Sequence, residues 1–140
     1  MLTQDQIIPF LLERCPEFVP AWKEHQNGIN ADVGPYTDVA EFVHFILDSY
    51  DRGNQELMPR IFQAVEDLLI KGDSSVQQIA ALGILETLQC AASWKPYGNK
   101  AFIQGLGPKS RAVWDELVEI WRGKSSLMDV VRAEQRQKRN

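Results

Sequence analysis

A single helical stripe of apolar side chains constrains the fold of this chain more than any other feature. Between residues 37 and 51 the apolar positions follow the spacing i, i+3, i+4, i+7, i+8 and i+11, which places them on one face of a helix. These positions are Val39, Phe42, Val43, Ile46, Leu47 and Tyr50. No segment of the sequence shows the alternation of a strand or a two-residue hairpin turn. The sequence therefore predicts an all-α protein.

Caps, prolines and glycines divide the chain into about six to seven helices, packed as antiparallel pairs in a HEAT-like array or an irregular bundle. The predicted helices cover residues 3–14, 16–27, 37–51, 54–71, 74–93 and 108–122, and a last helix starts near residue 125. Thr3 and Gln6 are spaced as a capping box, and Ser74 is expected to cap the fifth helix. Gly28 is expected to end the second helix in a left-handed conformation.

The length of 140 residues is close to the commonest size of one domain. Gly123 is predicted to break the sixth helix. We therefore expect an all-helical domain over residues 1–124 and a C-terminal helix with a frayed basic tail over residues 125–140. The cations of this tail could contact RNA or a membrane surface, but they most simply complement the dipole of their own helix. They are Arg132, Arg136, Lys138 and Arg139.

The stretch from Gly105 to Ser110, GLGPKS, contains the residue types of a phosphate-binding loop. Such a loop needs a glycine immediately before its lysine and a strand ahead of it, so that backbone N–H groups converge on the phosphates. Pro108 stands before Lys109 and has no N–H to offer, and residues 101–104 make a poor strand. Pro108 is better explained as the first residue of a helix. We therefore predict neither nucleotide binding nor a cofactor.

Glu41, His44 and Asp48 share one helix face, in a spacing that di-iron helical bundles use. Such a site needs a second Glu-x-x-His and two further carboxylates. The other histidine, His25, has Trp22 where the glutamate is required. A solvated polar face is the preferred interpretation. The sequence also lacks the GxSxG and SxxK nucleophile motifs, so we expect neither a metal site nor an enzyme.

The charge of the chain is unevenly distributed. Residues 1–73 carry a balance of −8 and residues 74–140 one of +4, which together give the net charge of −4. The acidic half argues against a general nucleic-acid binder, since such proteins neutralise phosphates, and it favours a partner with a basic surface. No apolar run is long enough to span a membrane, and no secretion signal is recognised. Two cysteines outside any CxxC motif indicate free, half-buried thiols. We expect a cytoplasmic protein that binds neither nucleic acid nor membranes.

Two surfaces could carry partner recognition. The polar face of the helix over residues 37–51 gathers four acidic residues and a histidine, and Phe45 lies beside them outside the apolar stripe. Phe45 is either covered by another helix or an aromatic anchor in an acidic surface. The loop after residue 93 adds aromatic residues that either tuck back onto the core or form a contact patch. The candidate partner-binding residues are Asp38, Glu41, His44, Phe45, Asp48, Asp51, Trp94 and Tyr97.

Four segments together show a distinctive pattern of core and cap positions. They are Cys15–Phe18 with Trp22, Val39–Phe42, Ile61–Gln89 and Leu106–Trp121. With this pattern the chain resembles a family of small bacterial all-helical proteins of uncharacterised domain type, which look HEAT-like and some of which are presumed immunity proteins of polymorphic toxin systems. The resemblance implies a stoichiometric inhibitor that binds and neutralises a cognate toxin. The alternative is a HEAT-like interaction scaffold or regulatory module unrelated to toxins.

Overall fold

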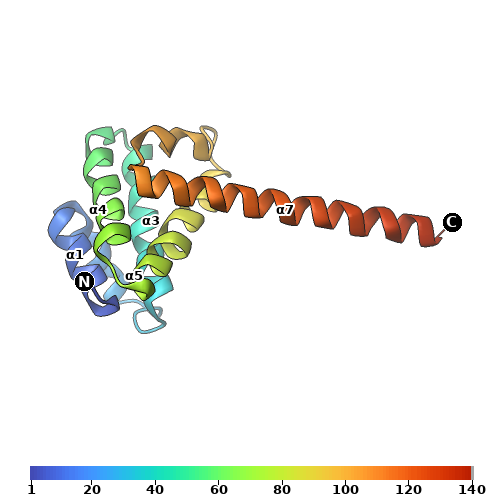
Figure 1. Cartoon of the computed structure of the whole chain (residues 1–140). Coiled ribbons are helices and arrows are strands. Elements are labelled where there is room, and N and C mark those ends of the chain that lie inside the picture. The colour runs from blue at the N-terminus through green and yellow to red at the C-terminus, as the bar shows by residue number, and fades with distance from the viewer. Residues whose placement is uncertain (140) are drawn as a thin grey trace.

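The computed structural model describes the backbone of residues 1–139 and the side chains of residues 1–123. Seven α-helices make up most of the described backbone (Figure 1), and the predicted all-α class is confirmed. The helices are α1 (Ile7–Arg14), α2 (Val19–Gln26), α3 (Pro35–Asp51), α4 (Met58–Lys71), α5 (Ser74–Gln78), α6 (Thr87–Ala92) and α7 (Pro108–Arg139). Shorter 3-10 or π-helical stretches are η1 (Gln4–Gln6), η2 (Pro16–Phe18), η3 (Gln55–Leu57), η4 (Ile79–Glu86) and η5 (Asn99–Gly105). Within the described backbone, the β-type pairing consists of one isolated bridge between Leu2 and Gly72.

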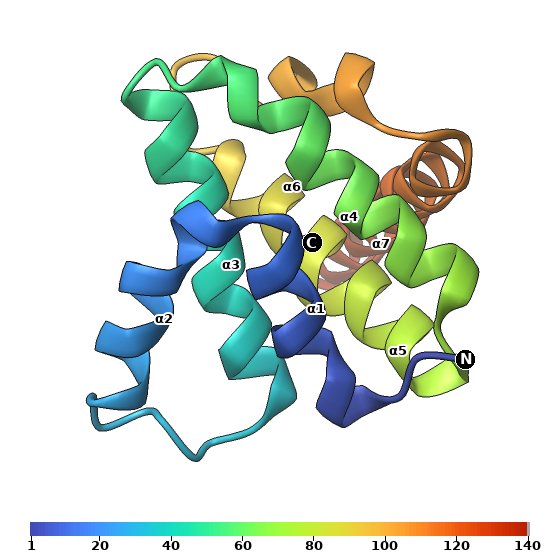
Figure 2. The ribbon, with the colours of Figure 1, turned by 90° about the vertical axis from the view of Figure 1, so that its left-hand side faces the viewer.

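The helical run over residues 74–92 occupies the centre of the fold. It consists of α5, η4 and α6 without interruption, and its π-helical part η4 packs against both α3 and α7. Helix α4 contacts α1 and also α7, and Figure 2 shows α1, α4 and α7 in this arrangement. The helices thus pack around one shared apolar core.

The apolar stripe of α3 is buried as the sequence predicts. Its fully buried members are Val39, Phe42, Val43 and Ile46, each at most 1% exposed. Leu47 is also buried, whereas Tyr50 is half-buried and its ring centroid lies 5.0 Å from that of Phe102. The helical period of the sequence therefore identifies the core-facing side of α3 correctly.

Gly83 allows η4 to approach α3 closely. A Cβ atom at this position would lie 2.6 Å from Cγ2 of Val39, closer than two carbon atoms can pack, and 3.2 Å from a ring carbon of Tyr36. Gly83 therefore permits the two helical segments to pack closely.

Two helix starts differ from the prediction. Helix α3 begins at Pro35, two residues earlier than expected, because Gly34 turns the chain with a φ of 147° that other residues rarely adopt. The N-cap of α5 is Asp73 and not Ser74, since Oδ1 of Asp73 accepts a hydrogen bond from the N–H of Val76 at 2.9 Å.

Two glycines do not act as predicted. Gly28 has no positive φ, so the predicted left-handed cap is wrong. Helix α7 continues through Gly123, so the predicted break is also wrong. One glycine lowers the stability of a helix by only about 1 kcal/mol, which is too little to end this one. The division of the chain at residue 124 stays a prediction. The tail cations Arg132, Arg136, Lys138 and Arg139 lie outside the described side chains.

Candidate functional site

The stretch GLGPKS begins a helix at Pro108, as predicted, and its donors bind a carboxylate of the same protein. Glu66 on α4 accepts hydrogen bonds from the N–H groups of Lys109 and Ser110 at 2.9 and 2.8 Å. It also accepts one from the Ser110 hydroxyl at 2.8 Å. Helix N-termini attract anions because their first N–H groups have no partner within the helix. Burial raises the pKa of Glu66, but these hydrogen bonds outweigh burial and hold that pKa below its ordinary value.

Gly107 lets the Glu66 carboxylate come this close to α7. A Cβ atom on Gly107 would lie 2.6 Å from Cδ and 2.7 Å from Oε1 of Glu66. Gly107, one of the glycines that suggest a nucleotide-binding loop, thus permits the contact between α4 and α7. Glu66 occupies the donors that a phosphate would need.

The acidic face of α3 meets a histidine from α2. Nε2 of buried His25 lies 3.0 Å from Oδ1 of Asp38, and Nδ1 lies 3.5 Å from Oε1 of Glu41. The other Glu41 oxygen lies 3.8 Å from Nδ1 of His44, which is exposed. The sequence placed Asp38, Glu41 and His44 together correctly but did not connect them to His25. Helical spacing cannot reveal that contact, because it joins two different helices.

The acidic residues further along α3 pair with cations. Oδ2 of Asp48 lies 3.2 Å from Nε of Arg52. Asp51 accepts hydrogen bonds from Nζ of Lys95 at 2.6 Å and from the hydroxyl of Tyr97 at 2.9 Å. These two bonds, chiefly the one from Lys95, lower the pKa of Asp51. Asp51 therefore links the end of α3 to the loop that follows α6.

The three aromatic candidates have different surroundings. Phe45 is half-buried with its ring centroid 5.4 Å from that of Phe18, so another helical segment covers it. Tyr97 packs its ring centroid 4.6 Å from that of Tyr50. Trp94, in contrast, is 87% exposed. The role of all three in partner binding stays a prediction.

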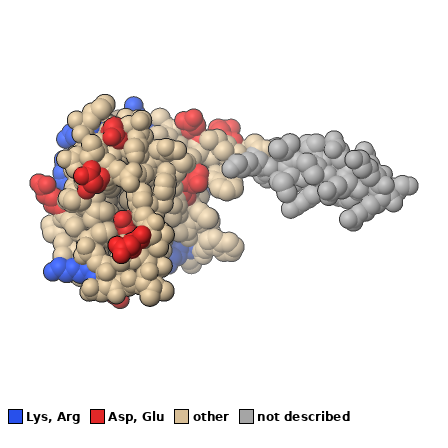
Figure 3. Space-filling view, turned by 90° about the horizontal axis from the view of Figure 1, so that it is seen from below, with Lys and Arg blue, Asp and Glu red and all other residues tan. Residues whose placement is uncertain are grey.

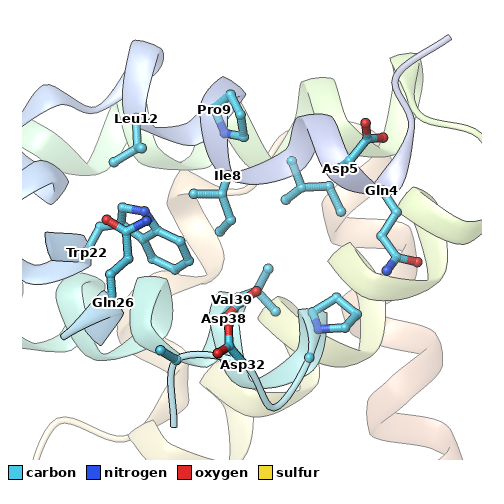
Figure 4. Close-up of a pocket in the computed structure, with 14 residues that line it drawn as sticks. Gln4, Asp5, Ile8, Pro9, Leu12, Trp22, Gln26, Asp32, Asp38 and Val39 are labelled. Atoms are coloured by element: carbon cyan, nitrogen blue, oxygen red, sulfur yellow. The ribbon is translucent and has the colours of Figure 1, made fainter. Parts of the chain in front are cut away.

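A groove of about 650 Å³ lies between α1, α2 and the first turn of α3 (Figure 4). Its floor is apolar and consists mainly of Ile8, Leu12, Trp22 and Val39. Three of these side chains are only half-buried, and Val39 is fully buried beneath them. The groove therefore presents apolar surface that the chain itself does not cover. We call it the α1–α3 groove.

The rim of the α1–α3 groove is acidic. It carries Asp5, Asp32 and Asp38, and none of the described lining residues is a lysine or arginine. Asp38 bonds His25, and Asp5 accepts a hydrogen bond from the Thr3 hydroxyl at 2.6 Å. Asp32 has no hydrogen bond or ion pair with any residue that the structure describes. Figure 3 shows the molecule from below, on the side of the loop between α2 and α3, where carboxylates stand on a mostly uncharged surface and lysine or arginine side chains lie mainly towards the edges.

The loop over residues 27–34 borders the groove and exposes two aliphatic side chains. Ile29 is 100% and Val33 65% exposed, while Ala31 and Asp32 of the same loop line the groove. Exposed aliphatic side chains beside an apolar groove are typical of a docking surface. The sequence indicated a loop here but not a role for it in binding. The signal that the sequence offered for such a role was the presence of aliphatic residues, Ile29 and Val33, in a segment without helical periodicity.

The reactive groups of the described residues are few. No three His, Cys, Asp or Glu side chains in the described part of the chain gather to hold a metal ion. The two cysteines are free, but neither is half-buried: Cys90 is exposed, and Cys15 is buried, which raises its pKa to about 11. Among the described helices, none combines the length and apolar character needed to cross a membrane.

The sequence profile of one domain family of unknown function, DUF7674, matches residues 8–122. The chain belongs to this family. Searches among curated proteins and among solved structures found no match. The matched range includes α1 through α6, the loop over residues 27–34 and the junction of α4 with α7. The chain thus contains the all-helical domain of uncharacterised type that the sequence predicts.

Proposed function

We propose that this protein is an immunity protein, a stoichiometric inhibitor that binds a cognate toxin with a basic surface and neutralises it. The observation that carries the proposal is the α1–α3 groove. Its carboxylates from Asp5, Asp32 and Asp38 surround an apolar floor, without a lysine or arginine among the described lining residues. An acidic rim speeds the approach of a basic partner, and an apolar floor holds the partner after contact.

Side-chain contacts within the protein link the helices that form the walls of the groove. His25 joins α2 to α3 through Asp38 at 3.0 Å. Next to this pair, Phe18 packs edge-on against Phe42 at a centroid distance of 5.1 Å. Because little of the chain has to be ordered on binding, less of the interaction free energy is lost. Such preorganisation suits an inhibitor that must hold its toxin tightly.

A nucleic-acid-cleaving toxin is the kind of target that this surface fits best. Such an enzyme binds phosphates in a basic groove. Carboxylates on the rim of the α1–α3 groove would compete with the phosphates for the same cations. The inhibitor would then block substrate binding directly, without any chemical reaction of its own.

Co-expression of the chain with the proteins encoded next to it tests the proposal. We expect one neighbour to co-purify as a one-to-one complex and its toxicity to disappear when the chain is present. The double variant Asp5→Asn/Asp32→Asn should slow association, most strongly at low salt. Asp115→Asn/Glu116→Gln is the matched control, since it also removes two negative charges, from exposed positions of α7 away from the groove. Absence of both a complex and protection with every neighbour would contradict the proposal.

The second candidate function is that of a HEAT-like scaffold or regulatory module, and Trp94 is the residue that favours it. This exposed residue follows α6 next to the Lys95–Asp51 pair, at the C-terminal end of α3, whereas the groove lies at the N-terminal end. Helix α3 has 17 residues, and a helix of that length spans about 25 Å. Two separate contact surfaces are therefore available. A ternary complex with two different proteins, detected by light scattering and without protection from toxicity, would favour this candidate.

A further inference from the structure

We infer that the α1–α3 groove recognises a partner segment in which a large apolar side chain stands within two residues of a lysine or arginine. This inference rests on the proposed function and adds which part of the partner is bound. The chemistry of the occupant follows from the floor of the groove, its rim and the adjoining loop.

The floor selects an apolar side chain. Ile8, Leu12 and Trp22 keep part of their surface exposed in the free protein, and Figure 4 shows Ile8 and Trp22 directed into the hollow. A leucine or aromatic side chain placed there would remove apolar surface from water on both molecules, which favours binding. A volume of about 650 Å³ accommodates such a side chain together with the backbone of its neighbours.

The rim selects a cation. Asp32 is exposed and has no partner among the described residues, and Asp5 accepts a single hydrogen bond, from Thr3. A guanidinium or ammonium group would pair with these carboxylates, whereas a carboxylate on the partner would be repelled. Successive residues of an extended segment lie about 3.3 Å apart. A cation one or two positions from the apolar anchor can therefore reach the rim.

The adjoining loop over residues 27–34 supplies Asp32 to the rim and exposes Val33 next to it. Ile29 of the same loop lies at a separate hollow, which Glu24, His25 and Glu41 line. The side-chain amide of Gln26 lines the groove and can bond the backbone of an extended segment. The apolar floor and the acidic rim thus line the same groove, and they call for both properties in one occupant.

Blocked tetrapeptides test the inference before the natural partner is known. The probe has a central Leu-Arg pair flanked by glycines, the charge control has Leu-Glu, and the apolar control has Ser-Arg. Nitrogen-15 NMR titrations would follow the indole N–H of Trp22 and the side-chain amide of Gln26. We expect the Leu-Arg probe to bind with a Kd on the order of 1 mM, and each control to bind at least about tenfold more weakly. Raising the salt concentration from about 50 mM to about 300 mM should weaken the probe several-fold.

Protein variants locate the binding. Asp5→Asn/Asp32→Asn should weaken the Leu-Arg probe several-fold and reduce its salt dependence. The control Asp115→Asn/Glu116→Gln removes the same two negative charges from exposed positions of α7 and should leave the affinity unchanged. Equal affinity for Leu-Arg and Leu-Glu, or shifts confined to residues outside the groove and its loop, would overturn the inference.

The results also separate this inference from the proposed function. Suppose that the chain captures a toxin, that the Asp5→Asn/Asp32→Asn variant retains the same affinity for it, and that no peptide binds. These results would overturn the inference and leave the inhibitor role intact. Selective binding of the Leu-Arg probe without capture of any neighbouring protein would support the groove chemistry and contradict the inhibitor role.

Discussion

Two regions of this molecule use carboxylates in opposite ways. At the junction of α4 and α7, buried Glu66 accepts three hydrogen bonds from Lys109 and Ser110. At the rim of the α1–α3 groove, exposed Asp32 accepts none from any residue that the structure describes. The chain itself supplies the donors at the junction, whereas solvent or another molecule must supply them at the groove.

The comparison shows why a stretch that resembles a ligand site can be structural. The N–H groups at the start of α7 do attract an anion, but Glu66 fills that position and leaves no room even for a methyl group on Gly107. The loop over residues 27–34 matches no known motif, yet it borders an open groove. A surface remains available to other molecules where its polar groups lack partners within the protein.

Glu66→Ala should have the largest effect on stability. It leaves the buried N–H group of Ser110 and the part-buried one of Lys109 without an acceptor, and a buried group without a partner costs about 1–3 kcal/mol. We expect the free energy of unfolding to fall by about 3 kcal/mol, measured by urea denaturation. Glu116→Ala, on an exposed position of α7, is the control and should change stability by less than about 0.5 kcal/mol. Equal losses of unfolding free energy in both variants would show that the hydrogen bonds of Glu66 do not stabilise the junction.

Alanine at two glycines of the α7 region should change stability in opposite directions. Gly107→Ala places a methyl group 2.6 Å from Cδ of Glu66, and such overpacking costs about 1–3 kcal/mol. Gly123→Ala meets no atom within 4 Å, since Gly123 lies on an open part of α7. It should therefore add up to about 1 kcal/mol through helix propensity. Thermal unfolding of both variants measures the difference, and a shift of the same sign in both would contradict the prediction.

Features that depend on local spacing could be predicted from the sequence. The apolar face of α3 and the start of α7 at Pro108 follow from helical period and from proline geometry. The capping box at Thr3 is present, with the Thr3 N–H donating to Oε1 of Gln6 at 2.9 Å. Gly53 ends α3 with a φ of 82°. All of these depend on residues close together along the chain.

Features that join distant segments could not be predicted in this way. The contact between Glu66 and Ser110 spans 44 positions, and that between His25 and Asp38 joins two helices. The predicted acidic residues of α3 do lie on one helix, but the sequence could not show which of them the protein pairs internally. The α1–α3 groove needs three segments and a loop. Its existence depends on how those helices cross, which local periodicity does not determine.

Acid should weaken the junction of α4 and α7. The pKa of Glu66 lies below its ordinary value of 4.5 in the folded protein, because the bonds from α7 outweigh the effect of burial. The unfolded chain therefore binds the proton more readily. The stabilisation is complete above pH 4.5 and is lost as the pH falls through the folded-state pKa.

Glu66→Gln removes this titration, so its free energy of unfolding should fall less steeply between about pH 6 and about pH 3. Some slope should remain from Asp67, whose pKa is raised by burial but lowered overall by the hydrogen bond from Arg14. Urea denaturation at several pH values compares the two proteins. Identical pH slopes would mean that Glu66 does not titrate as described.

Asparagine at two aspartates of the groove rim should separate structure from binding. Asp38→Asn should lower the free energy of unfolding by about 1 kcal/mol, because the carboxylate bonds His25 and stands in the first turn of α3, where the helix dipole favours negative charge. Asp32→Asn should change stability by less than about 0.5 kcal/mol and still weaken the Leu-Arg probe. If Asp32→Asn destabilised the fold as much as Asp38→Asn, Asp32 would have an internal partner, and the rim would resemble the junction of α4 and α7 and not a surface for recognition.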